Sequence, residues 1–199
     1  PLVLSNLLRG YFHIGSHPSF LLLALASGVP FNGMFLYLLS APTFLGEHLG
    51  LAPTQFFWFF LCTIGGIMGG AFLSGRLAGR ISHARQIKYG FSIMLIVSLV
   101  NLVANLVFKA HASWALIPIG LYSLGWAMMT PVVTLMVLDL FPDRRGMAAS
   151  MQTFVASMSN GVVAGVVAPL VMHSTIALAS TSLLFMLVGL AAWRVLQRR

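Results

Sequence analysis

Six long apolar runs, separated by short polar segments, dominate the pattern of residues along this chain. They cover residues 19–42, 54–75, 89–108, 113–138, 148–172 and 175–193. A helix needs about 20 mostly apolar residues to cross the hydrocarbon core of a bilayer. The runs are too long for the strands of a membrane barrel, and they lack the alternation of such strands. The pattern therefore predicts an all-α membrane protein with six transmembrane helices.

The composition agrees with a chain that lies in a bilayer. Of the 199 residues, 59% are hydrophobic and 7% are charged, and Asp and Glu together number three. Soluble domains are about half apolar and about a quarter charged. So few charges could not cover a water-facing surface of this size. We therefore expect the lipid bilayer to surround most of the chain.

The reactive side chains show none of the spacings that enzymes or metal sites require. The single cysteine, Cys62, lies inside an apolar run, so neither a disulfide framework nor a cysteine metal site is available. The six histidines lack metal-ligand spacing, and no pair of nucleophile and base stands out. The sequence predicts no enzyme, no catalytic or metal-binding residue and no cofactor.

The basic residues mark one side of the predicted membrane protein. The arm before the first run, the loops after the second and fourth runs, and the tail contain Arg9, Arg76, Arg80, Arg85, Lys88, Arg144, Arg145, Arg194, Arg198 and Arg199. The opposite side contains only Lys109. Because loops rich in Lys and Arg stay in the cytoplasm, this asymmetry predicts that both termini are cytoplasmic. It also explains the net charge of +8 without a nucleic-acid partner.

Three segments follow from this arrangement. Residues 1–18 form a cytoplasmic arm, in which the stretch LSNLLRGYFHIG is typical of an amphipathic helix at a membrane surface. Residues 19–193 form the six-helix bundle, and residues 194–199 form a basic cytoplasmic tail. Because the chain begins with Pro1 instead of Met, we expect that its upstream sequence is missing.

A glycine-rich stretch, GGIMGGAFLSGRLAGR at residues 65–80, raises the question of phosphate binding. Its spacing excludes a dinucleotide fingerprint, and Arg76 and Leu77 stand where a phosphate-binding loop needs Lys and Ser or Thr. Inside a membrane, small residues four positions apart instead allow two helix backbones to approach closely. This interpretation assigns helix packing to Gly65, Gly66, Gly69 and Gly70.

Two further stripes of small residues recur at the same spacing. The stripe in the fifth run consists of Ser157, Gly161, Gly165 and Pro169. It predicts a packed, bent helix in which Gly161 and Gly165 contact a neighbour. The stripe in the fourth run consists of Ser123, Ala127, Thr130 and Thr134.

Polar, aromatic and helix-breaking residues inside the runs are candidates for a binding site. Pro30 and Gly33 flank Asn32 in the first run, and transporters place such helix breaks beside their binding sites. An aromatic and methionine face in the fourth run suits an adaptable apolar site. The candidate cavity residues are Asn32, Phe35, Tyr122, Trp126, Met129 and Asn160.

These candidates have structural alternatives. Asn32, Gln152 and Asn160 fit hydrogen bonds between helices equally well, and this interpretation is favoured for Asn101 and Asn105. The aromatic and methionine face of the fourth run also fits simple packing or lipid contact.

Carboxylates are absent from the middle of the predicted spans. Asp139 lies at the end of the fourth run near Arg144 and Arg145, so we expect an ion pair there. Proton-driven transport commonly uses an ionisable group inside the membrane. If protons are coupled, the acid must therefore lie outside these six spans.

Two local patterns resemble the C-terminal half of a major facilitator superfamily transporter. The stretch GGAFLSGRLAGRI (69–81) is similar to the superfamily's loop motif, in which a helix end runs into an arginine-rich cytoplasmic turn. Gly75 stands where the best form of this motif carries an aspartate, while Arg76 and Arg80 remain to cap the helix end and to meet acidic partners or lipid headgroups. The stretch TPVVTLMVLDLFPDRRGMAASMQTF (130–154) is similar to the junction of the tenth and eleventh helices in the Bcr/CflA drug:proton antiporters.

The resemblance implies that the runs are helices seven to twelve of a twelve-helix transporter in a bacterial inner membrane, with residues 1–18 ending its central loop. The first, second, fourth and fifth runs would line a central cavity, and the third and sixth would face lipid. Protons would pass through the missing N-terminal six-helix half, and the substrate would be a small amphipathic or apolar drug. The implied function is multidrug efflux by drug:proton antiport, with the two halves alternating in access.

Two other functions stay open. A facilitator or symporter of a small nutrient or metabolite in the same superfamily should show several converging polar groups. A six-helix scaffold without transport activity, or a subunit of a membrane enzyme, should be stable without a second half.

Overall fold

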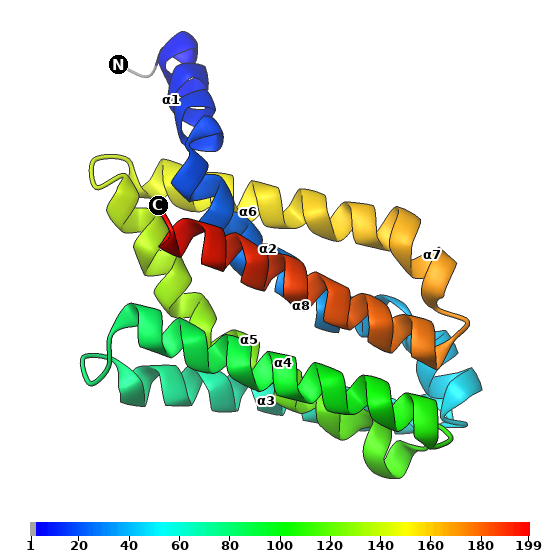
Figure 1. The fold of residues 1–199 in the computed structure, drawn as a ribbon. Coiled ribbons are helices and arrows are strands. Elements are labelled where there is room, and N and C mark those ends of the chain that lie inside the picture. The colour runs from blue at the N-terminus through cyan, green and yellow to red at the C-terminus, as the bar shows by residue number, and fades with distance from the viewer. Residues whose placement is uncertain (1–2) are drawn as a thin grey trace.

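The computed structural model describes residues 3–199, and all regular structure in this range is helical (Figure 1). Short polar turns and proline-containing segments connect long apolar helices. In chain order, the elements are α1 (Leu4–Ser16), α2 (Pro18–Leu39), η1 (Pro42–His48), η2 (Pro53–Gln55), α3 (Phe57–Leu77), α4 (His83–Val107), α5 (Ala112–Leu140), α6 (Arg145–Val162), η3 (Val163–Val167), α7 (Ala168–Val171) and α8 (Thr175–Gln197).

Within residues 3–199, six segments are long and apolar enough to cross a membrane, which confirms the predicted all-α fold. They are Pro18–Leu39, Pro53–Leu77, His83–Val107, Ala112–Leu140, Arg145–Val171 and Thr175–Gln197. The third span begins at His83, although its apolar run begins at residue 89. The Ser82 side chain caps this helix by accepting a hydrogen bond from the Arg85 backbone N–H at 3.2 Å, so α4 continues beyond its apolar part.

The two most buried spans, α2 and α5, form the centre of the bundle. Helix α5 packs against α3 and α4, and α2 packs against α8. Contacts between α2 and α5 and between α4 and α8 join these two groups (Figure 1). Helices α3 and α6 are the most exposed spans, and α6 touches the bundle mainly through α2.

Close packing of α3 on α5 depends on two of the glycines. A Cβ atom on Gly66 would overlap the Gly120 carbonyl, and one on Gly70 would overlap the Leu124 carbonyl. A Cβ added to Gly69 would lie 3.5 Å from a side-chain atom of Leu124. A Cβ added to Gly65 would have no atom of residues 3–199 within 4 Å outside its own helix. One GxxxG pair therefore makes the predicted close approach, and Gly65 lies outside the contact.

Proline does not break the first span as the sequence suggested. Helix α2 runs through Pro30 without interruption. The proline ring packs against Gly189 of α8, where a Cβ would not fit. In the fifth span, a π-helical segment, Val163–Val167, comes just before Pro169. Gly161 and Gly165 have no neighbour within 4 Å of an added Cβ. The helices that the structure describes therefore do not use these two glycines for packing.

Helix α1 runs across the direction of the spans, at the end of the bundle where α8 finishes (Figure 1). Its buried residues are Gly10 and Ile14, and the Met147 side chain of α6 occupies the space beside Gly10. An apolar stripe on the rest of the helix is exposed and consists of Leu4, Leu8 and Phe12. Such a helix has the amphipathic form of a membrane-surface segment.

Candidate functional site

A groove between α2, α5 and α6 has a volume of about 380 Å³. Its walls combine aromatic rings, hydroxyl groups and amides, and among residues 3–199 no charged side chain lines it. The lining residues are Ala24, Ser27, Gly28, Phe31, Trp126, Thr130, Thr134, Ala149, Gln152, Thr153, Ala156, Ser157 and Asn160. The groove therefore suits an uncharged or delocalised ligand with a large apolar part.

One face of α2 forms the first wall. Its lining residues recur every three or four positions, because residues at this spacing share one side of a helix. Phe31 lies on this face, with its ring centroid 4.9 Å from that of Trp126. The ring of Phe35, one turn further along α2, stacks on Phe31 at 5.5 Å. Three aromatic rings thus form a continuous surface at the groove.

Helix α5 forms the second wall through Trp126, Thr130 and Thr134. The Trp126 indole N–H donates a hydrogen bond to the Ser27 carbonyl of α2 at 2.9 Å. The Thr130 hydroxyl donates to the Trp126 carbonyl at 2.7 Å. The bond to α2 holds the indole in place, so the ring is a rigid part of the groove.

Helix α6 forms the third wall and supplies both side-chain amides of the groove. The Gln152 amide nitrogen lies 3.4 Å from the Ser27 hydroxyl and 3.5 Å from the Thr134 hydroxyl, distances at which hydrogen bonds are weak. The Asn160 side-chain oxygen is buried and accepts no hydrogen bond within residues 3–199. Buried polar atoms are usually satisfied, so this oxygen lacks the donor that a buried amide oxygen normally has.

The structure brings together some of the predicted cavity residues. Trp126 and Asn160 line the groove, and Phe35 extends its aromatic surface. Asn32 is 1% exposed and donates a hydrogen bond to the Ser159 hydroxyl, which links α2 to α6. Asn32 therefore forms a hydrogen bond between helices, which was the structural alternative to a place in the cavity.

Two predicted cavity residues, Tyr122 and Met129, lie outside the groove. Tyr122 is buried and donates to the Pro30 carbonyl, and Met129 is fully buried beside Gly90 of α4. Successive residues lie about 100° apart around a helix, so Met129 points well away from its neighbour Thr130. Both side chains belong to the packed centre of the bundle.

Sequence reasoning missed several groove residues. Ser27 and Phe31 are two of them. They lie four positions apart on the same side of α2 as Phe35, and this periodicity is the signal that identifies them. Thr130 and Thr134 belong to the small-residue stripe of the fourth run, and they also line the groove. The other half of that stripe packs elsewhere, since Ala127 contacts Gly70 of α3.

Hydrogen bonds also explain the polar residues of the third span. The Asn101 amide donates to the Tyr37 hydroxyl at 3.0 Å, and the Asn105 amide donates to the Asn101 carbonyl at 2.7 Å. Asn101 thus faces α2 inside the bundle, which agrees with the structural interpretation that the sequence favoured.

The residues of the predicted loop motif lie at the end of α3. Gly75 has open space around it, and Arg76 lies over the Phe72 ring, 5.5 Å from its centroid. The backbone N–H of Arg80 donates to the Leu77 carbonyl at 3.0 Å in the following turn. Gly79 in this turn has a φ of +76°, a conformation that favours glycine.

A buried glutamine that the sequence did not single out connects three helices near this turn. The Gln86 amide of α4 donates to the Ser74 hydroxyl of α3 and to the Met128 carbonyl of α5, both at 2.8 Å. At the same end of the bundle, the predicted ion pair of Asp139 is present. Its carboxylate lies 3.0 Å from the Arg145 guanidinium, and both side chains are exposed.

Comparison with known proteins places these features in one family. A family model described as Major Facilitator Superfamily matches residues 2–169. This range contains α1 to α6 and all the residues that line the groove. The search of curated proteins found no match.

Proposed function

The chain belongs to the Major Facilitator Superfamily of membrane transporters, and from this premise we propose that it forms the C-terminal half of a multidrug efflux transporter. The uncharged, aromatic groove between α2, α5 and α6 carries this proposal. Ligand pockets of drug-sized molecules measure about 300–1,000 Å³ and are mostly apolar with a few polar groups. The groove has this size and composition.

The exposed polar residues of α6 indicate that a second half of the transporter covers the groove. Thr153 and Ser157 line the groove and are exposed, and polar side chains in a membrane face protein or water. We propose that an N-terminal six-helix half lies opposite α2, α5 and α6. Movement of the two halves would expose the groove to each side of the membrane in turn.

Proton coupling is assigned to this other half. Within residues 3–199, the acidic side chains are Glu47, Asp139 and Asp143, and none of them lines the groove. A proton carrier inside the membrane needs an ionisable group whose charge is linked to conformation. We propose that the protein lies in a bacterial inner membrane. Both termini would then be cytoplasmic, because the basic residues follow that orientation.

Export of an amphipathic fluorescent dye, from cells that express the complete protein, tests the proposal. Phe31→Ala removes the ring that contacts Trp126, and we expect the export rate to fall up to about tenfold, since an aromatic pair contributes about 0.5–1.5 kcal/mol beyond its buried area. Phe108→Ala is the matched control, because Phe108 is exposed and lies outside the groove. Equal export by both variants at equal protein levels would contradict the assignment of the groove.

A facilitator or symporter of a small nutrient is the second candidate. The Gln152 amide and the unpartnered oxygen of Asn160 favour it, because both could bind a polar molecule. Uptake assays separate the two functions. If Asn160→Leu abolishes uptake of a polar nutrient while dye export is absent from the parent protein, the nutrient transporter is correct.

A further inference from the structure

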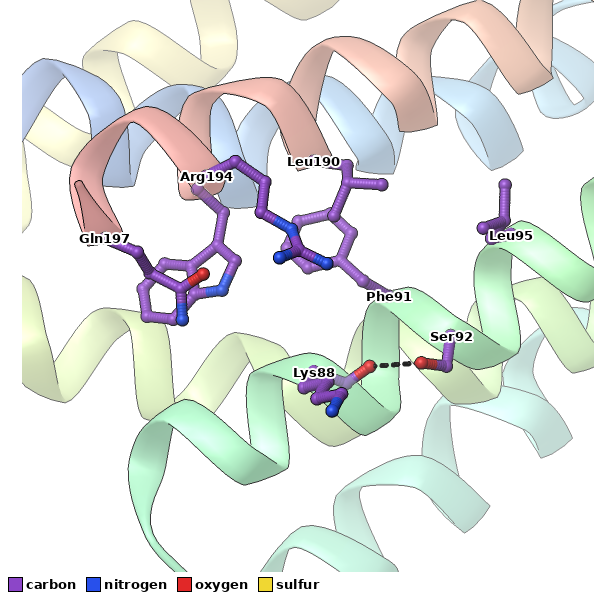
Figure 2. Close-up of a pocket in the computed structure, with 8 residues that line it drawn as sticks. Lys88, Phe91, Ser92, Leu95, Leu190, Arg194 and Gln197 are labelled. Atoms are coloured by element: carbon purple, nitrogen blue, oxygen red, sulfur yellow. Dashed lines mark hydrogen bonds between the residues drawn. The ribbon is translucent and has the colours of Figure 1, made fainter.

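A second groove lies between α4 and α8, at the end of the bundle where α8 finishes (Figure 2). Its volume is about 170 Å³. The residues that line it are Lys88, Phe91, Ser92, Leu95, Leu190, Trp193, Arg194 and Gln197. None of them lines the groove between α2, α5 and α6, so the two sites are separate.

The side chains of this groove change from charged to apolar along its length. Lys88 and Arg194 are exposed at its mouth, while Phe91 and Trp193 are buried in its floor. With a rise of 1.5 Å per residue, Leu95 lies about 10 Å deeper along α4 than Lys88. Helix α8 runs in the opposite direction. Leu190 therefore lies about 6 Å deeper in the membrane than Arg194 along α8.

Among residues 3–199, neither cation at the mouth has an acidic partner. The ion pair that forms among residues 3–199 joins Asp139 to Arg145, on a different pair of helices. Arg85 precedes Lys88 on α4, and Arg198 follows Arg194 at the end of α8. The mouth therefore attracts an anion without any competing carboxylate of its own.

Neutral polar groups stand beside these cations. The Ser92 hydroxyl donates a hydrogen bond to the Lys88 carbonyl at 2.7 Å, drawn as a dashed line in Figure 2. The oxygen of this hydroxyl remains free to accept. The Gln197 amide lies on the same side as Arg194. Arg and Lys bind phosphate through charge-assisted hydrogen bonds, and Arg can do so with two donors.

We propose that the groove between α4 and α8 binds an anionic glycerophospholipid. The phosphate lies between Lys88 and Arg194, and an acyl chain passes over the aromatic floor toward Leu95 and Leu190. Basic pockets between transmembrane helices suit anionic headgroups. The order of charged and apolar groups along the groove matches the order of phosphate and acyl chain in such a lipid. This proposal requires only that the chain lies in a membrane, so it does not depend on the transported substrate.

Native mass spectrometry of the purified chain in detergent tests the proposal. Phosphatidylglycerol or phosphatidylcholine with the same acyl chains is added, and the bound lipid is counted. Lys88→Gln together with Arg194→Gln should weaken phosphatidylglycerol binding about thirtyfold, because each cation near an anionic surface contributes about fivefold. Phosphatidylcholine carries a choline cation beside its phosphate, so it should bind the parent more weakly than phosphatidylglycerol and lose less affinity in the variant.

Two further variants distinguish the site from general effects of charge. The exchange of Lys88→Arg with Arg194→Lys keeps both charges and should retain the preference for phosphatidylglycerol. Lys109→Gln removes a cation beside a different apolar groove, at the start of α5, and should leave lipid binding unchanged. An unchanged affinity in the double glutamine variant, or an equal loss in Lys109→Gln, would overturn the proposal. Displacement of the bound lipid by inorganic phosphate alone would assign the groove to free anions and overturn it as well.

Discussion

Individual polar side chains in this protein mostly connect helices. Asn32, Asn101 and Trp126 each donate a hydrogen bond to a neighbouring span. In a bilayer these bonds replace contacts with water, and the hydrocarbon offers no other partner. Polar residues in the spans are therefore evidence first of packing. Among residues 3–199, the side-chain oxygens of Asn32 and Asn160 are both buried without a hydrogen-bond donor, and of these two residues only Asn160 lines the groove.

A substitution of Gln86 tests whether hydrogen bonds between helices stabilise the bundle. Gln86→Leu keeps a similar size but removes both donors at the junction of α3, α4 and α5. Hydrogen bonds between membrane helices contribute about 0.6 kcal/mol each and at most about 1.7 kcal/mol, so the free energy of unfolding should fall by about 1–3 kcal/mol. Unfolding in mixed detergent micelles measures this change.

Gln197→Leu is the control for this prediction. Gln197 is exposed at the end of α8, and its side chain donates no hydrogen bond to residues 3–199, so its replacement should leave unfolding almost unchanged. Equal effects of the two substitutions would show that the bridge from Gln86 does not stabilise the bundle.

Packing between whole helices depends on which face of each helix carries small residues. Six glycines lie between residues 65 and 80, yet Gly66 and Gly70 make the close approach to α5. The neighbouring positions Gly65 and Gly75 face open space. A glycine motif thus identifies a helix that packs closely, and its neighbour determines which of the glycines is essential.

Substitutions on the two faces of α3 should therefore differ in effect. Gly66→Ala places a Cβ against the Gly120 carbonyl, which cannot move without shifting α5. We expect a loss of about 1–3 kcal/mol in stability, the usual cost of overpacking. Gly65→Ala adds the same methyl group in open space and should be neutral or slightly stabilising.

Thermal unfolding of the purified chain, followed by circular dichroism, compares the two alanine variants. The midpoint should fall for Gly66→Ala and stay within a few degrees of the parent for Gly65→Ala. A larger decrease for Gly65→Ala would show that the other face of α3 packs against protein.

At the scale of the whole molecule, an even number of spans brings α1 and the end of α8 to the same end of the bundle (Figure 1). The turn between α3 and α4 lies at this end, and the turn between α4 and α5 lies at the other. The two most exposed spans, α3 and α6, do not cover one another within residues 3–199. The groove itself is open where Thr153 and Ser157 of α6 are exposed, as it would be in half of a transporter.

Cysteine labelling in intact cells tests the orientation in the membrane. In a Cys62→Ala background, Ala84→Cys lies in the first turn of α4 and Ser113→Cys in the first turn of α5. Because ten of the eleven basic residues lie on the side of Ala84, we expect an impermeant maleimide to label Ser113→Cys alone. Opening the cells should then allow Ala84→Cys to react.

The reverse labelling pattern would place both termini outside the cell and contradict the charge argument. Labelling of both positions in intact cells would show that the chain had not inserted as a six-span unit.

The sequence by itself determined the all-α membrane fold, the number of spans and the ion pair of Asp139. These features depend on the length of apolar runs and on residues close together in the chain, so no knowledge of neighbouring helices is needed. Only the tertiary structure decided which face of each helix is buried. It placed Met129 in the core and Phe31 in the groove, and it brought Lys88 and Arg194 from distant spans to the lining of one groove. Contacts between helices decide these positions, since in a bilayer almost every face of a span is apolar and periodicity alone does not distinguish lipid from protein.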